Sequence, residues 1–407
     1  MFINISGPLG AVQPMLAMPD EHHFTEAPER DRARVLAAIA AGARSRPEIG
    51  ERLGMRSTTT SRAVAELLSR RLLLEASGEP RGRGRPAATL LVNARRAGVS
   101  VIHVASRSFV GVLLDLGGQV LERRVVTVEP EAGNAALGAV LAGLAVGLAA
   151  AAPRGMSHAG TVVSVSGLVD VRRRQWLVSS RWPRMRHFDI EAAIAPAAGP
   201  VDVVRHLDAD LRTRALADPV TYSEDVVLLH WGWGIGMSYA VGGQPFGVAG
   251  GPFGEIGHWR INGLEARSCG CGRQGCLETV AGLWSLLPVL RSRWPDLAED
   301  EDTLLGQLRG LDLLAVPEIH EAARHMARVL GNVCRILFPA HVVVSSPLMG
   351  NARLWAHFDA LFRAEGLMDG MAPPRLHNDP LAIGHGITGA AAPLLGRGVE
   401  ALLREPG

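Results

Sequence analysis

Hydrophobic positions recur at helical spacing near the start of the chain. Residues 1–25 contain three prolines and no periodicity, so they are expected to form a flexible tail. After them, Val35, Leu36 and Ile39 fall on one helical face, and Gly42 is suited to end that helix. The pattern predicts a first amphipathic helix.

Two more helices are predicted directly after the first. Ser45 can cap a short helix that runs to Leu53, and Gly54 is suited to end it. Ser57 then caps a longer helix over residues 58–72. Its inward positions are Val64, Leu67, Leu68 and Leu72, and its outward positions are Thr59, Thr60, Arg62, Arg70 and Arg71. This succession is typical of a helix-turn-helix, which binds DNA.

A basic hairpin is predicted after the third helix. Two short apolar segments flank a tip in which Arg81, Arg83 and Arg85 alternate with glycine. Guanidinium groups on such a backbone suit phosphates or a narrow minor groove. We therefore expect a winged helix-turn-helix over residues 26–93. Its candidate DNA contacts are Ser57, Thr58, Thr59, Thr60, Arg62, Arg81, Arg83 and Arg85.

The positive charge is concentrated in this region. The sequence contains no lysine, and residues 26–96 hold 15 Arg against 8 Asp and Glu, a net +7, whereas the whole chain is +2. A basic module on a mildly acidic body indicates double-stranded DNA as the partner of that module. The alternative is a small three-helix domain with solvated charges, but it leaves the order of capped helix, turn, helix and basic wing unexplained.

From Gly98 onward the pattern changes to buried strands. The apolar runs VSVIHVA and FVGVLLDL, and a second strand-rich set that starts with DVVLLHW, predict two α/β lobes with a ligand cleft between them. We assign residues 97–395 to this body and 396–407 to a C-terminal tail. Residues 135–152 are uncharged and near membrane-spanning length, but their alanine and glycine content and Pro153 favour a buried helix.

Three of the four cysteines lie close together in the sequence and suggest a metal site. His258, Cys269, Cys271 and Cys276 supply the one nitrogen and three sulfurs of a closed structural zinc site. The alternative is a group of buried free thiols, and Cys334 is expected to be an ordinary core residue. So few cysteines do not indicate a disulfide framework, and residues 1–23 lack a secretory leader, so a cytoplasmic location is expected.

The segment GEIGHWRINGLEARSCGCGRQGCLE closely resembles the signature of the ROK family (repressors, open reading frames and sugar kinases). With the winged helix before it, the chain resembles the repressor branch of that family over about residues 30–395. The resemblance implies a two-lobed actin-like or hexokinase-like (ribonuclease H-like) fold that binds a sugar between its lobes. It also implies a homo-oligomer, a dimer or tetramer.

The resemblance also implies which residues contact the sugar hydroxyls. Glu255 and His258 match the first half of the signature, Glu278 matches the glutamate after the last cysteine, and Asp208 matches the general base of the kinases. Carboxylates and a neutral imidazole accept from or donate to vicinal hydroxyls. Leu207 stands where the family has asparagine, which puts sugar specificity, or sugar binding itself, in question.

The phosphate side departs further from the family kinases. Their aspartate-x-glycine-glycine-threonine loop aligns with His103, Ala105, Ser106 and Arg107, and their glycine-threonine-glycine loop with residues 232–234, where Trp233 replaces the hydroxyl residue. Ser345, Ser346 and Pro347 replace the glycine run on the adenosine side. Because phosphoryl transfer depends on positioning and charge neutralisation, Asp208 alone cannot sustain it.

These features predict a DNA-binding regulator, in this branch usually a repressor, that senses a sugar or sugar derivative and is not an enzyme. Effector binding between the lobes would change the spacing of two winged helices on an operator. One alternative is an active sugar kinase with an appended DNA-binding module. Another is a sensor that answers to a protein partner instead of a sugar.

Overall fold

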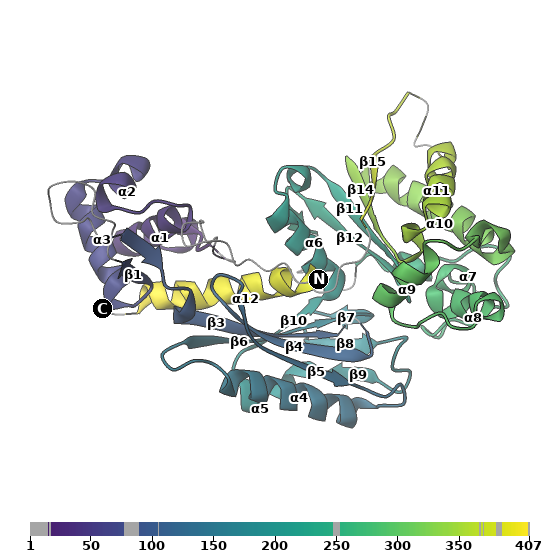
Figure 1. The fold of residues 1–407 in the computed structure, drawn as a ribbon, viewed down its shortest axis with the longest axis horizontal. Coiled ribbons are helices and arrows are strands. Elements are labelled where there is room, and N and C mark those ends of the chain that lie inside the picture. Colours follow the sequence, from purple (N-terminus) through teal and green to yellow (C-terminus); the bar gives the residue numbers. More distant parts are fainter. Residues whose placement is uncertain are drawn as a thin grey trace.

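The structure is a computed structural model with an elongated shape (Figure 1). It describes residues 15, 18–76, 89–104, 106–246, 253–365, 368, 370–379 and 385–405. Ala105 and the predicted wing contacts Arg81, Arg83 and Arg85 lie outside the described residues.

The N-terminal domain has the expected order of elements. Ser45 Oγ accepts a hydrogen bond from Glu48 N at 3.4 Å, and Gly54 adopts a left-handed conformation with φ of 63°, so the second helix begins and ends where the sequence predicts. The elements are α1 (Ala27–Ala40), α2 (Arg46–Leu53), α3 (Ser57–Ser69) and the antiparallel strands β1 (Leu73–Ala76) and β2 (Thr89–Val92).

Three expectations for α3 are wrong. Ser57 is the first helical residue, and the preceding cap residue Arg56 makes no side-chain capping bond. Thr60 is fully buried and donates its hydroxyl to the Arg56 carbonyl at 3.2 Å, so it does not face outward. Arg70 is also buried, because it binds a helix from the far end of the sequence.

The first lobe is built on a five-stranded sheet of order β10-β6-β3-β4-β5. Strands β3, β4 and β5 are antiparallel neighbours, and β6 and β10 run parallel to β3. The strands are β3 (Ala97–Val104), β4 (Ser108–Asp115), β5 (Val120–Thr127), β6 (Ser157–Val165) and β10 (Val201–Arg205). A three-stranded sheet contains β7 (Leu168–Asp170), β8 (Gln175–Val178) and β9 (Arg186–Asp189).

Helices α4 (Asn134–Ala150) and α5 (Ile190–Ala198) pack together on the first lobe. The alanine-rich segment is therefore a helix, as predicted, and it buries a leucine-rich face formed by Leu137, Leu141, Leu144 and Leu148. Across the part of the chain that the structure describes, no helix is long and apolar enough to span a membrane.

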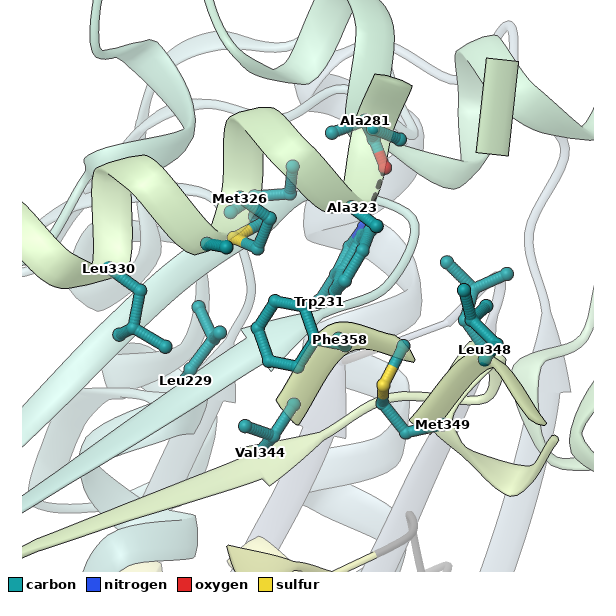
Figure 2. Packing of buried hydrophobic residues seen from close by; sticks show 14 of the residues in the cluster. Leu229, Trp231, Ala281, Ala323, Met326, Leu330, Val344, Leu348, Met349 and Phe358 are labelled. Atoms are coloured by element: carbon teal, nitrogen blue, oxygen red, sulfur yellow. Dashed lines mark hydrogen bonds between the residues drawn. The ribbon is translucent and has the colours of Figure 1, made fainter. Parts of the chain in front are cut away.

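The second lobe is built on a five-stranded sheet of order β13-β12-β11-β14-β15. Its core contains Trp231, whose ring lies 5.5 Å from that of Phe358 and whose Nε1 donates to the Ala281 carbonyl at 2.7 Å (Figure 2). The strands are β11 (Val226–Trp231), β12 (Ile235–Val241), β13 (Gln244–Pro245), β14 (His341–Ser345) and β15 (Arg375–Asn378). The helices are α7 (Glu278–Ala281), α8 (Leu283–Arg293), α9 (Glu301–Leu308), α10 (Pro317–Leu337) and α11 (Ala352–Glu365).

Two further helices join the parts of the molecule. Helix α6 (His206–Ala217) follows β10 of the first lobe and packs against β12 of the second. Helix α12 (His385–Arg404) lies along α6 and along β3 and β6, and its far end reaches the N-terminal domain (Figure 1). The predicted tail over 396–407 is therefore wrong for the described residues, since Val399, Leu402 and Leu403 are buried apolar positions of this helix.

Two buried arginines of the N-terminal domain bind the end of α12. Arg32 of α1 donates from Nε and Nη2 to the Leu403 carbonyl at 3.0 and 2.6 Å. Arg70 at the end of α3 donates from Nε and Nη2 to the Glu405 carbonyl at 3.2 and 2.7 Å. The last carbonyls of a helix have no partner within it and carry partial negative charge, so guanidinium donors are well suited to them.

The described part of the predicted N-terminal tail is also ordered against α12. Residues Glu21–His23 form one turn of 3-10 helix, and Phe24 is only 3 % exposed. The guanidinium of Arg404 lies 4.7 Å from the centre of the Phe24 ring, and His23 Nδ1 is 2.8 Å from a Glu400 carboxylate oxygen. These contacts could not be predicted, because the segment has no hydrophobic periodicity in its sequence.

Candidate metal centre and ligand cleft

The four predicted metal ligands come together on a tight loop between β13 and α7. The loop is closed by a bridge between Ser268 and Gln274, and Cys269 N donates to the Arg273 carbonyl at 2.8 Å. Gly272 and Gly275 have φ of 86° and 74°, a left-handed conformation that other residues rarely adopt, and this lets the loop fold back on itself.

The donor atoms have the spacing of a tetrahedral site. Those of His258, Cys269, Cys271 and Cys276 all lie within 4.8 Å of one another. Cys271 Sγ is 3.8 Å from Cys276 Sγ, and Cys269 Sγ is 3.6 Å from His258 Nδ1. Tetrahedral bonds of about 2.3 Å to sulfur and about 2.0 Å to nitrogen require edges of roughly 3.8 Å and roughly 3.6 Å. The residues present therefore fit a metal ion.

Two thiols of this cluster are held in an environment that disfavours the thiolate. Burial raises the pKa of Cys269 and of Cys276, so their neutral forms are favoured there. A bound divalent cation reverses this preference, because thiolates are its ligands. Cys334 lies apart from the cluster, on the buried face of α10 in the apolar core, as predicted.

Asp208 is buried at the start of α6. It is 3 % exposed, and its Oδ1 accepts from Ser238 Oγ of β12 at 2.6 Å. Its Oδ2 lies 3.7 Å from Nε of Arg205, a buried arginine whose Nη2 donates to the Met237 carbonyl at 2.7 Å. The first turn of a helix favours a negatively charged side chain, so the position of Asp208 in α6 suits a carboxylate.

Glu278 is anchored to the loop that connects β11 and β12. Its Oε1 accepts from Ile235 N at 2.8 Å, and its side chain is almost fully buried. Gly257 passes close to it: a Cβ atom there would lie 2.4 Å from the Ile235 carbonyl oxygen and 2.8 Å from Glu278 Oε1. The glycine before His258 is thus required by this close approach.

Glu255 completes the group of carboxylates that the sequence predicts. Burial raises its pKa to about 7, the charges of Glu278 and Asp208 act in the same direction, and Arg205 opposes them. Asp208 and Glu278 are therefore close enough to Glu255 for their charges to act on it. With a pKa of about 7, the carboxyl group of Glu255 can both donate a hydrogen bond to a hydroxyl and accept one from it near neutral pH.

Glu255→Gln should flatten the dependence of stability on pH. The folded-state pKa is raised, so the stabilisation from protonated Glu255 is fully present below about pH 4.5 and is lost as the pH rises through about 7. We expect the wild type to lose about 2 kcal/mol more than the variant between pH 5 and pH 8. Urea unfolding at these two pH values measures the difference. Equal losses in the two proteins would contradict the assignment.

The phosphate side of the cleft is lined differently. His103, near the end of β3, is partly buried. Burial lowers its pKa to about 4, and its Nδ1 has no hydrogen-bond partner among the described residues. Its ring lies 6.5 Å from that of His206, which lies 5.6 Å from that of His230. Ser345 and Ser346 are buried at the end of β14. Imidazoles and hydroxyls stand at these positions, and a carboxylate oxygen of Glu301 lies 3.5 Å from His230 Nε2.

Residues 101–392 of the sequence match the ROK family. The chain belongs to the ROK family. Two relatives from Escherichia coli are described as DNA-binding regulators. The repressor Mlc is 28 % identical over 161 residues, 37 % of this chain and 38 % of Mlc. The dual regulator NagC is 22 % identical over 318 residues, 75 % of this chain and 77 % of NagC. The alignment with Mlc thus spans less than half of either protein.

Solved ROK structures share the fold. A ROK family transcriptional regulator, a homologue of the Escherichia coli Mlc protein, has a TM-score of 0.71 at 21 % identity and covers 94 % of this chain and 98 % of its own. A ROK hexokinase from Thermus thermophilus has a TM-score of 0.56 at 22 % identity, over 75 % and 99 %. The predicted α/β architecture and the family resemblance are therefore confirmed, and the fold is common to regulators and kinases.

The N-terminal domain in front of the ROK body exposes part of the predicted DNA-contact set. Ser57 and Thr58 are exposed at the start of α3, and Thr59 is half-buried. Arg62 is exposed and lies 3.6 Å from the Asp31 carboxylate, so its guanidinium already has an acidic neighbour.

Two features of the ROK cleft were not predicted. Arg205 pairs with Asp208 from the position just before α6, and Leu207 between them is 6 % exposed and packs toward Gly236. The second feature is a contact between Arg181 and Glu301, residues 120 positions apart. Arg205 lies only three positions before Asp208 but belongs to no motif, whereas Arg181 and Glu301 are brought together only by the folded chain.

Proposed function

We propose that this chain is a DNA-binding transcriptional regulator, a repressor in its mode of action, whose ROK domain senses a sugar or sugar derivative and does not phosphorylate it. One observation carries the proposal: a helix-turn-helix is bound to the last turn of α12, which runs along the helix that holds Asp208. Mlc and NagC, which are described as DNA-binding regulators, support it.

The sugar is bound by Asp208, Glu255, His258 and Glu278 in this proposal. The mutual effects of the carboxylates and the anchoring of Glu278 to Ile235 N support a site that is fixed before its ligand arrives. Leu207 adds an apolar wall where an asparagine would add a hydrogen bond. A ligand with one fewer hydroxyl contact at that point is therefore favoured.

The metal in this proposal is zinc. One nitrogen and three sulfur donors at tetrahedral spacing suit its preferences, and all four positions are filled by the protein, as in structural sites. The ion would fix His258, which stands three residues after Glu255. It would supply structure only.

The absence of kinase activity is proposed because His103 and Trp233 stand where the family kinases have phosphate-binding residues. Purified protein with ATP, magnesium and a panel of hexoses should form no sugar phosphate, while calorimetry with the same panel should detect binding. Robust turnover would instead establish the alternative, an active kinase with an appended DNA-binding module, which the hexokinase fold and Asp208 keep in view. Binding of no sugar would favour a sensor of a protein partner.

The DNA-binding role is tested on the wing. The triple variant R81A/R83A/R85A should bind a duplex, selected from random DNA by the full chain, at least about tenfold more weakly. Its salt dependence should be shallower by about 2 to 3 in logarithmic slope, since three phosphate contacts are removed. Fluorescence anisotropy at several salt concentrations measures both.

The matched control changes three exposed arginines of the first lobe, Arg172, Arg173 and Arg184. That variant loses the same charge and should keep wild-type affinity and slope. Equal behaviour of the two triple variants would show that the wing makes no specific contribution. Operators of a homo-oligomer are expected to be pseudo-palindromic, with half-sites about one helical turn or a multiple apart.

A further inference from the structure

The loop between β11 and β12 is held by two carboxylates. Glu278 accepts from Ile235 N at 2.8 Å, and Glu301 Oε1 accepts from Trp233 N at 2.7 Å. Glu301 is the first residue of α9, and its other oxygen lies 3.5 Å from His230 Nε2. Trp233 N belongs to the loop that aligns with the phosphate loop of the family kinases. The backbone N–H of Trp233 is therefore already hydrogen-bonded to the Glu301 side chain.

The same carboxylate is bound from the opposite lobe. Arg181 follows β8 of the first lobe, and its Nη2 donates to Glu301 Oε1 at 3.3 Å. Its guanidinium also lies 4.9 Å from the centre of the Trp233 ring. The side chains of Arg181 and Glu301 are 7 % and 14 % exposed, so the pair is largely shielded from water.

A second pair joins the lobes next to the first. Arg107 lies between β3 and β4 of the first lobe, and its Nη2 is 2.9 Å from Glu299 Oε1, two residues before Glu301. Arg107 falls within the segment that aligns with the metal-organising loop of the kinases. This segment thus carries the positive charge of Arg107, where the kinase loop carries a negative aspartate. The acidic residues Glu299 and Glu301 of the other lobe can therefore approach it.

We propose that Arg107, Arg181, Glu299 and Glu301 form an interlobe latch that holds the two lobes closed on the phosphate side and blocks the loop amide from a nucleotide. The latch is connected to the other side of the cleft, because Trp233 N and Ile235 N, two residues apart, are bound by Glu301 and Glu278. Any coupling of the latch to an effector bound on the Glu278 side rests on the proposed function. Its role in closing the lobes does not.

The Arg181–Glu301 pair is the buried part of the latch, whereas the side chains of Arg107 and Glu299 are 37 % and 30 % exposed. Removing one partner of a buried ion pair leaves the other charge uncompensated, so the lobes have reason to separate once the pair is broken. Separation also removes Arg181 from Glu301 Oε1, the acceptor of Trp233 N, and from the Trp233 ring, so exchange of this loop with solvent reports the open state. The exchange rate of this loop is therefore a direct measure of the latch.

Hydrogen exchange of the full chain, followed by mass spectrometry over residues 226–241, tests the proposal. E301A removes both the acceptor and the charge, and exchange of the loop should rise about tenfold, whereas E301Q keeps an acceptor and should raise it about fivefold. R107E and E299R should each raise it as well. The double variant R107E/E299R should return it to within about twofold of wild type, because the pair is restored in reverse.

A matched control is the exposed pair Arg353 and Asp312, which lies within the second lobe at 2.8 Å. R353E should leave exchange of the loop unchanged. Single latch variants with wild-type exchange, or a double variant that is no better than the single ones, would overturn the latch. The two proposals fail separately: a protein without sugar-dependent operator binding can keep its latch, and a latch-free protein can still respond to sugar.

Discussion

Cys276→Ser is expected to reduce the zinc content of the purified chain from about one ion to near zero and to lower its Tm by about 10 °C. Structural zinc contributes folding free energy directly, and three remaining donors hold the ion much more weakly than four. Cys276 is 1 % exposed and leads directly into α7, which carries Glu278. Loss of the ion should therefore also loosen the sugar side of the cleft.

Metal analysis of protein prepared without chelator, with thermal unfolding of the same samples, measures this effect. Cys334→Ala is the matched control, because it removes a buried thiol of the same lobe that lies outside the cluster. The control should retain about one zinc ion per chain. A wild type with far less than one ion per chain, or a Cys276 variant with full metal content, would contradict the ligand set.

Gly389→Ala is expected to destabilise the chain by about 3 kcal/mol, because it forces two packed helices apart. A Cβ atom at this position of α12 would lie 2.0 Å from the Ala209 carbonyl oxygen and 2.7 Å from Thr213 N, both in α6. These backbone atoms cannot move without moving the whole helix. Since α6 carries Asp208, affinity for the sugar should fall together with stability.

Gly143→Ala is the control for this prediction. Gly143 is a helical glycine of α4 that is exposed and has nothing within 4 Å of an added Cβ atom. Alanine there should stabilise the chain by up to about 1 kcal/mol through helix propensity alone. Chemical denaturation of both variants provides the comparison. A Gly389 variant as stable as the wild type would mean that α6 and α12 are not held in the arrangement described.

Features written in local sequence could be predicted. The cap at Ser45, the stop at Gly54 and the alanine-rich helix follow from residue chemistry within a few positions of one another. The four metal donors could be found because all of them lie within 19 residues. The proposed sugar-side residues were identified by the family resemblance, which also assigned them to one site.

Features that depend on distant segments could not be predicted. Arg70 resembles an outward arginine of a recognition helix, yet it is buried because residues 335 positions later cover it. Thr60 satisfies its hydroxyl within its own helix and can therefore be buried. On the phosphate side, the expected departures from the family kinases come from the sequence alone, whereas the contacts of Glu299 with Arg107 and of Glu301 with Arg181 are seen only in the folded chain.

The arginine contacts at the end of α12 have a consequence for how such regulators exchange domains. Residues 26–93 form a continuous segment, but the surface that supports them is supplied by residues 400–405. A chimera that transfers the first segment to another body removes the Leu403 and Glu405 carbonyls that Nε and Nη2 of Arg32 and Arg70 bind here. Recombination between relatives should therefore succeed only where residues 26–93 and 400–405 are exchanged together. The functional DNA-binding unit is then encoded by two separate parts of the gene.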